Sequence, residues 1–185
     1  MPDPNLFLGK ALLGLGALGV AMGLLALLAP GPLCAGLKAF PRSKAPGWIL
    51  MAIGTFWVCW VISHAALGRF EVVKPFIPVL GVVAYAATVY FLDELLAPRA
   101  LGGLLLLLAN PLLNGVRWAD SAWRYAVILI AYAWVVAGCA LMLHPWTFRQ
   151  LGEKFAGSAG AVLTIGWGKV LGGAILLAAG GWWLR

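Results

Sequence analysis

Apolar positions fill this chain in long uninterrupted runs, and polar positions fall mostly in the short stretches between the runs. The runs lack the alternation of half-buried strands, and most have about the 20 apolar residues that a helix needs to cross a hydrocarbon core of about 30 Å. Lipid offers backbone groups no water, so continuous runs of this kind form helices rather than barrel strands. The pattern predicts an all-α integral membrane protein, a single polytopic domain over residues 1–185, with about six transmembrane helices at residues 6–29, 47–67, 73–92, 100–116, 123–143 and 162–184.

The fourth predicted helix differs from the others in length and in its sequence. Its apolar part, residues 100–116, would be only about 26 Å long as a helix. Pro111 has no N–H to donate to the carbonyl of Leu107, which leaves an acceptor unpaired inside an apolar segment. We therefore expect this helix to be short and kinked at Asn110-Pro111, either crossing upright with local thinning of the bilayer or bending at that pair.

Composition supports the membrane class. The chain is 63% hydrophobic and 10% charged, with a mean hydropathy of +0.97, whereas soluble domains are about a quarter charged. The net charge is +7, but the 13 basic residues are mostly scattered singly through the connections. Such residues suit lipid headgroups and set topology, whereas a nucleic-acid surface needs clustered bases. We expect the lipid bilayer, and no nucleic acid, as a partner.

Basic residues also bear on orientation. In a six-helix topology the two sides receive six Lys and Arg residues each, so the overall count does not decide the orientation. The densest cluster, Lys38, Arg42 and Lys44 in the first connection, favours a cytoplasmic position for that side, with both termini outside. The interpretation is a multi-pass protein of the cell (cytoplasmic or inner) membrane.

A weak internal echo appears when the chain is shifted by 115 positions. Each copy consists of a helix, a proline stop and an interfacial segment that ends before the next helix. The helices that follow do not align residue by residue, and shared membrane composition is an alternative explanation. The matching pairs are Val20 and Val135, Gly23 and Gly138, Leu28 and Leu143, Pro30 and Pro145, Phe40 and Phe155, and Ser43 and Ser158.

The sequence gives little support for haem binding, a thiol redox site, a metal site or hydrolytic catalysis. His64 and His144 end predicted helices at opposite membrane surfaces, so they cannot share one haem. The three cysteines have no CxxC spacing, and no HExxH or paired-acid motif occurs. We predict no metal site, no cofactor and no catalytic residue, which favours a protein other than an enzyme.

The Asn110-Pro111 region is the best candidate for function. Asn110 and Asn114 lie one turn apart, and we expect this amide face to point into the bundle. One interpretation is a solute, ion or water contact, with Lys169 or the acids at 93 and 94 supplying charge. The other, which we favour, is hydrogen bonding between helices at a packed interface.

Asp93, Glu94 and Arg99 form a second candidate, a charge cluster beside the fourth helix. If the turn dips inward, the cluster could handle protons or cations. We favour the alternative that the turn lies in the headgroup layer and that Arg99 pairs locally.

Glycine spacing favours close helix packing and an assembly. GxxxG pairs let backbones approach closely, and tryptophans are unusually frequent. The leading hypothesis is a non-catalytic accessory or structural subunit of a larger membrane complex. The alternatives are a small transporter or substrate-binding membrane subunit that uses the Asn110/Asn114 face and, third, a redox or lipid-handling membrane subunit. Partner subunits or a second copy would dock on the glycine faces formed by Gly19, Gly23, Gly168 and Gly172.

Overall fold

The computed structural model describes residues 3–92, 95–156 and 159–184, and every regular element in these ranges is helical. In chain order the elements are α1 (Pro4–Leu28), α2 (Pro30–Ala39), the 3₁₀ helix η1 (Phe40–Arg42), α3 (Lys44–His64), the 3₁₀ helix η2 (Gly68–Phe76), α4 (Ile77–Phe91), α5 (Leu96–Val116), α6 (Trp123–Leu143), α7 (Trp146–Ala156) and α8 (Ala159–Trp183).

Six of these segments are long and apolar enough to cross a membrane: α1, α3, η2 with α4, α5, α6 and α8. Each predicted range falls on one of them, so the all-helical fold with six potential spans is confirmed. The third range is split between two helix types. Pro75 lies inside η2 and Pro78 in the first turn of α4, and a missing N–H is best tolerated in a first turn.

The prediction of a short fourth helix is wrong. α5 begins at Leu96 rather than at residue 100 and has 21 residues, which gives about 32 Å. Pro98 lies in its first turn, and Arg99 is part of the helix rather than a residue before it. The α-helix continues unbroken through Pro111, and a kink at Asn110-Pro111 stays a prediction.

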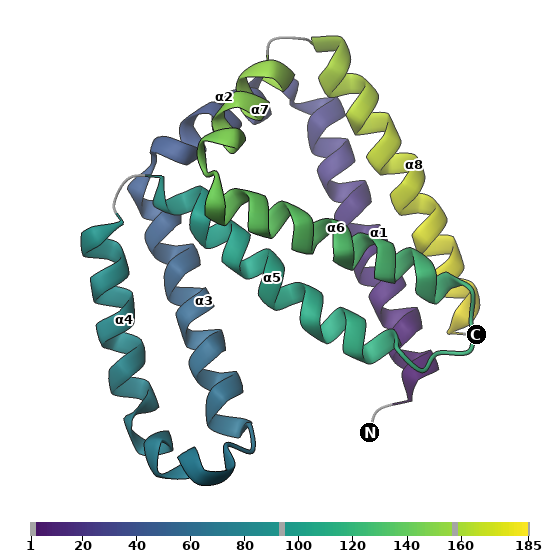
Figure 1. Ribbon diagram of the computed structural model, residues 1–185. Helices are drawn as coiled ribbons and strands as arrows, with labels where there is room; N and C mark the ends of the chain where they lie inside the picture. The colour runs from purple at the N-terminus through teal and green to yellow at the C-terminus, as the bar shows by residue number, and fades with distance from the viewer. Residues whose placement is uncertain (1–2, 93–94, 157–158, 185) are drawn as a thin grey trace.

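The long helices form three antiparallel pairs, α1 with α8, α5 with α6, and α3 with α4. Figure 1 shows α5 and α6 lying obliquely between the α1–α8 pair and the α3–α4 pair. Both ends of the described chain lie on the side opposite α2 and α7 (Figure 1). We call these two sides the terminal end and the α2–α7 end.

Glycines allow the close approach of the helices in two of these pairs, α1 with α8 and α5 with α6. A methyl group added at Gly16 on α1 would lie 2.8 Å from the carbonyl oxygen of Gly173 on α8. On the other pair, a methyl at Gly102 on α5 would lie 2.7 Å from the carbonyl oxygen of Gly138 on α6. These backbones touch because no side chain separates them, as in small-residue interfaces between membrane helices.

The enclosed core lies near the terminal end. It is built from Leu8 and Leu12 of α1, Val116 at the end of α5 and Val127 of α6, each with no exposed surface. The Asn5 side chain accepts a hydrogen bond from the Asp120 N–H at 3.1 Å, which ties the start of α1 to the α5–α6 connection. The α3–α4 pair takes no part in this core.

The two short helices were not predicted as helices. α2 and α7 pack on each other at one end of the molecule (Figure 1), and the rings of Phe40, at the end of α2, and Phe148 lie 5.2 Å apart. A proline lies at the start of each short helix: Pro30 is the first residue of α2, and Pro145 directly precedes α7.

The 115-residue echo extends to the order of elements. The spans α1 and α6 end at Leu28 and Leu143, and the spans α3 and α8 begin at Lys44 and Ala159, each pair 115 positions apart. The packing partners differ, because α1 packs on α8 whereas α6 packs on α5. The two halves therefore share a secondary-structure pattern without sharing their interfaces.

Candidate functional site

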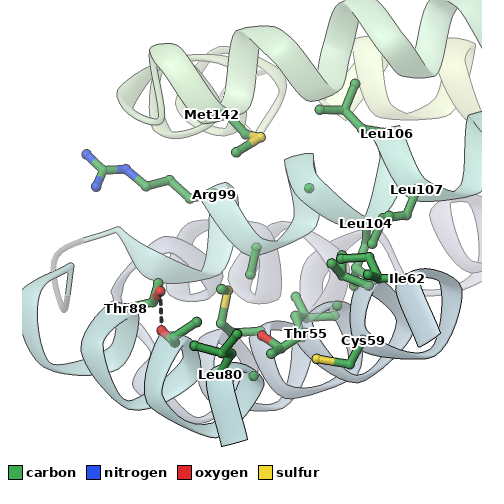
Figure 2. A pocket seen from close by; sticks show the side chains of 18 of the residues that line it. Thr55, Cys59, Ile62, Leu80, Thr88, Arg99, Leu104, Leu106, Leu107 and Met142 are labelled. Atoms are coloured by element: carbon green, nitrogen blue, oxygen red, sulfur yellow. Dashed lines mark hydrogen bonds between the residues drawn. The ribbon is translucent and has the colours of Figure 1, made fainter. Parts of the chain in front are cut away.

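A cavity of about 780 Å³ lies between α3, α4 and α5, with Met142 of α6 at its edge (Figure 2). Along α5 its walls run from Leu96 to Asn110, a length of about 21 Å. Several wall side chains are also exposed at the surface, such as Leu80 at 54% and Ile62 at 38%. The cavity is therefore open to the surroundings of the protein.

The cavity forms because α3 packs closely on α5 whereas α4, the other helix of the α3–α4 pair, does not. α3 approaches α5 closely at its start, where a methyl at Gly47 would lie 3.0 Å from the Ala97 nitrogen. One heptad further along α3, Gly54 still faces Leu104, with 3.7 Å between an added methyl and the leucine side chain. α4 packs on α3, with Gly81 against the Cys59 sulfur, rather than along α5. The space between α4 and α5 stays open.

The walls are apolar apart from four side chains, Thr55, Thr88, Arg99 and Asn110. Among the described wall residues Arg99 is the only charged one, and none is a carboxylate or an imidazole. The walls thus present aliphatic surface with one cationic group. Such a lining suits the apolar part of a ligand better than it suits acid–base chemistry.

Two polar atoms in these walls are buried without a partner. The Thr88 hydroxyl donates to the Ala84 carbonyl at 2.7 Å, as hydroxyls in helices often do. In contrast, the Thr55 hydroxyl oxygen and Arg99 Nε are both buried and have no hydrogen-bond partner among the described residues. A buried unpaired donor costs about 1–3 kcal/mol, so both groups favour a further contact that the described residues do not supply.

Arg99 lies at the α2–α7 end of the cavity. It is three residues into α5, whose start packs against the start of α3 and against η1. Figure 2 shows its guanidinium at the side of the cavity away from Leu104 and Leu107. Exposed basic residues are frequent on this side of the chain: Lys38, Arg42, Arg149 and Lys154. The acid Glu153 already faces Arg149 at 3.7 Å.

The predicted amide face is formed but does not point into the bundle. Asn110, Pro111 and Asn114 are all exposed. The Asn114 amide donates to Asn110 Oδ1 at 2.9 Å, so the two side chains partly satisfy each other. Within the described part of this chain they contact no other helix in the way expected, and a contact with a helix of a partner stays a prediction. Asn110 nevertheless reaches the far end of the cavity.

The other site residues predicted from the sequence are not found at the cavity. Lys169 lies exposed on α8, which packs on α1, and it is not among the described wall residues. Asp93 and Glu94 lie outside the described residues, so the predicted cluster with Arg99 stays a prediction.

The histidines and cysteines lie apart from one another. His64, at the end of α3, contacts the Trp60 carbonyl through Nδ1 at 2.8 Å and packs on the Trp60 ring, as expected for a helix-capping histidine. His144 follows α6 at the other end of the molecule and contacts the Trp146 ring. Within the described residues no three His, Cys, Asp or Glu side chains gather into a group that could hold a metal ion. The three cysteines are unpaired.

The cavity itself was not predicted from the sequence. The available signal was the spacing of Gly47 and Gly54, seven residues apart on α3, which marks the face that packs on α5. Nothing in the sequence indicates that α4 stays away from α5. Comparisons of the chain with protein-family models, with curated proteins and with solved structures find no match. What the protein binds therefore has to be inferred from the chemistry of the cavity walls.

Proposed function

We propose that this chain is a multi-pass protein of the cytoplasmic (inner) membrane that binds the apolar chain of a lipid between α3, α4 and α5, without catalysing a reaction. The observation that carries the proposal is the apolar cavity of about 780 Å³. Its volume lies in the usual range for small-molecule sites, about 300–1,000 Å³. It is also large enough that an empty state would forfeit many van der Waals contacts.

The shape and position of the cavity support a lipid over a compact solute. The walls extend about 21 Å along α5, which exceeds the roughly 15 Å thickness of one leaflet's hydrocarbon. An apolar cavity does not hold water stably, and this one opens on its exposed side to the surroundings of the spans. In a bilayer those surroundings are acyl chains. These features support the lipid-handling class, the third of the hypotheses that the sequence raises.

A cavity-filling variant tests the proposal. Gly103 lines the cavity, and a methyl group added there meets nothing within 4 Å. We expect Gly103→Phe to fill part of the cavity and to reduce the number of lipids that stay bound in native mass spectrometry of protein purified in mild detergent. Gly172→Phe on α8 is the matched control, because Gly172 also faces open space but is not a cavity residue.

The outcomes separate cleanly. Loss of bound lipid in Gly103→Phe, with lipid retained in Gly172→Phe, supports the proposal. Equal lipid retention by the wild type and both variants contradicts it. Thermal unfolding of both variants identifies a variant that has merely lost its fold, and Gly103→Leu then supplies a smaller filling side chain.

A second candidate is the accessory subunit of a membrane complex, and the exposure of the α3–α4 pair favours it. Large apolar side chains such as Phe56, Val82 and Phe91 are each at least 69% exposed there. Among the described long helices α4 packs mainly on α3, so a partner helix could cover its other faces. Co-purification of one defined partner in mild detergent supports this candidate, and a monodisperse lone species counts against it.

A further inference from the structure

We propose that the occupant of the cavity is an anionic phospholipid, whose phosphate binds Arg99 at the α2–α7 end while one acyl chain lies between α4 and α5. This inference rests on the proposed function and adds the headgroup class and the leaflet. The observation that carries it is a single cationic side chain at the mouth of a largely apolar cavity, at an end of the protein where several exposed basic residues lie.

The first step concerns the Arg99 side chain. Its Nε is buried and has no hydrogen-bond partner among the described residues. A guanidinium presents five N–H donors in a planar fork that matches the oxygens of a phosphate. Hydrogen bonds from such a cation to a phosphate are about twice as strong as neutral ones. The Arg99 side chain as a whole is only partly buried, so the ends of its guanidinium fork are the donors open to a phosphate oxygen.

The second step concerns depth. Arg99 is the fourth residue of α5, so it lies within about 5 Å of the helix start. An arginine so placed reaches the headgroup layer with its charged end while its stem lies along apolar surface. From Arg99 to Asn110, the last cavity residue on α5, the helix rises about 16 Å. That span matches about one leaflet of hydrocarbon, so a lipid with its phosphate at Arg99 fits its chain inside the cavity.

The third step concerns the sign of the charge. No described wall residue carries a negative charge. The same end of the molecule bears the exposed side chains of Lys38, Arg42 and Lys154, and Glu153 there faces Arg149. A basic residue beside the bound headgroup contributes about fivefold to the binding of an anionic over a neutral lipid. The arrangement favours an anionic headgroup over a zwitterionic one.

The test is native mass spectrometry of the full-length protein with phosphatidylglycerol and phosphatidylcholine of identical acyl chains. We expect the wild type to retain phosphatidylglycerol preferentially. Arg99→Gln should lower the ratio of bound phosphatidylglycerol to phosphatidylcholine about fivefold, and Arg99→Lys should give an intermediate ratio, since lysine keeps the charge but loses the planar fork. Arg117→Gln, at the opposite end of α5, is the matched control and should leave the ratio unchanged.

The outcomes distinguish this inference from the proposed function. If Gly103→Phe removes both lipids but Arg99→Gln leaves their ratio unchanged, the cavity holds an acyl chain and the headgroup assignment is overturned. If Gly103→Phe removes neither lipid, the proposed function itself fails. Pairing of Arg99 with Asp93 or Glu94 would instead appear as a lower thermal stability of Arg99→Gln with an unchanged lipid ratio, and that result also overturns the headgroup assignment.

Discussion

Gly16 and Gly173 touch across the α1–α8 interface. A methyl group on Gly16 would lie 2.8 Å from the carbonyl oxygen of Gly173, and one on Gly173 would lie 2.7 Å from the carbonyl oxygen of Gly16. The contact is reciprocal, and Gly102 and Gly138 repeat it across the α5–α6 interface. Two of the three antiparallel pairs are thus held at distances that only glycine allows.

This contact predicts opposite results for two adjacent glycines. Gly173→Ala should destabilise the fold by about 1–3 kcal/mol, because the new methyl meets backbone that cannot move aside easily. Gly172 faces open space, so Gly172→Ala should be neutral or raise stability by up to about 1 kcal/mol through helix propensity. Thermal unfolding of the two variants in the same detergent measures the difference. Equal melting temperatures would contradict the assigned interface.

The same glycines show what the sequence can and cannot specify. Long apolar runs predicted all six potential spans, because length and hydropathy are sufficient to identify them. The spacing of Gly168 and Gly172 predicts a glycine face on α8 for a partner; both face open space in this chain, so that docking stays a prediction, and the glycines of α8 that pack on α1 are Gly166, Gly173 and Gly180. A helix that is apolar all round has no polar face to fix its orientation. Which glycines are buried is then decided by the neighbouring helix.

The orientation of the amide face and the existence of the cavity both differ from the sequence-based expectation, for related reasons. Asn110 and Asn114 were expected inside the bundle because polar groups are costly in lipid, but the two side chains hydrogen-bond to each other and remain exposed. The cavity depends on the distance between α4 and α5, which is a tertiary property. The sequence marks Arg99 by its charge, yet its place at the mouth of the cavity follows only from the packing of α5 on α3.

The contact between α2 and α7 leads to a prediction about coupling. The rings of Phe40 and Phe148 lie 5.2 Å apart, and they join segments 108 positions apart in the sequence. In a double-mutant cycle of Phe40→Ala and Phe148→Ala, we expect a coupling energy of about 0.5–1.5 kcal/mol. Chemical or thermal unfolding of the two single variants and the double variant provides the values. Strictly additive effects would show that the two helices do not support each other.

The threonines of the cavity wall should respond differently to the same change. Thr55→Val removes a buried hydroxyl that has no partner among the described residues, so we expect stability to stay equal or to rise by about 1 kcal/mol. Thr88→Val removes a hydroxyl that donates to the Ala84 carbonyl, where we expect no such gain. A clear fall in melting temperature for Thr55→Val would mean that a bound ligand satisfies this hydroxyl.

The asparagine pair predicts a modest coupling of its own. Asn110→Leu leaves the Asn114 amide without its acceptor, and Asn114→Leu leaves Asn110 without its donor. Hydrogen bonds between side chains in membrane helices average about 0.6 kcal/mol, so the double variant should be at least as stable as the worse single variant. Lipid retention should stay near the wild-type level in Asn114→Leu, because Asn114 is not among the cavity residues. A large loss of bound lipid in that variant would favour a direct ligand role for the amide face.

The most direct test of the central claim is to locate the bound acyl chain. A phosphatidylglycerol that carries a diazirine in the middle of one acyl chain is reconstituted with the full-length protein and activated by light, and the labelled residues are identified by peptide mass spectrometry. We expect labels on the cavity side of the α3–α4 pair and of α5, at residues such as Thr55, Leu80 and Leu107. These labels should be lost in Gly103→Phe but not in Gly172→Phe. Labels spread evenly over the outer faces of α1, α6 and α8, with none enriched at these positions, would contradict the assignment of a lipid site.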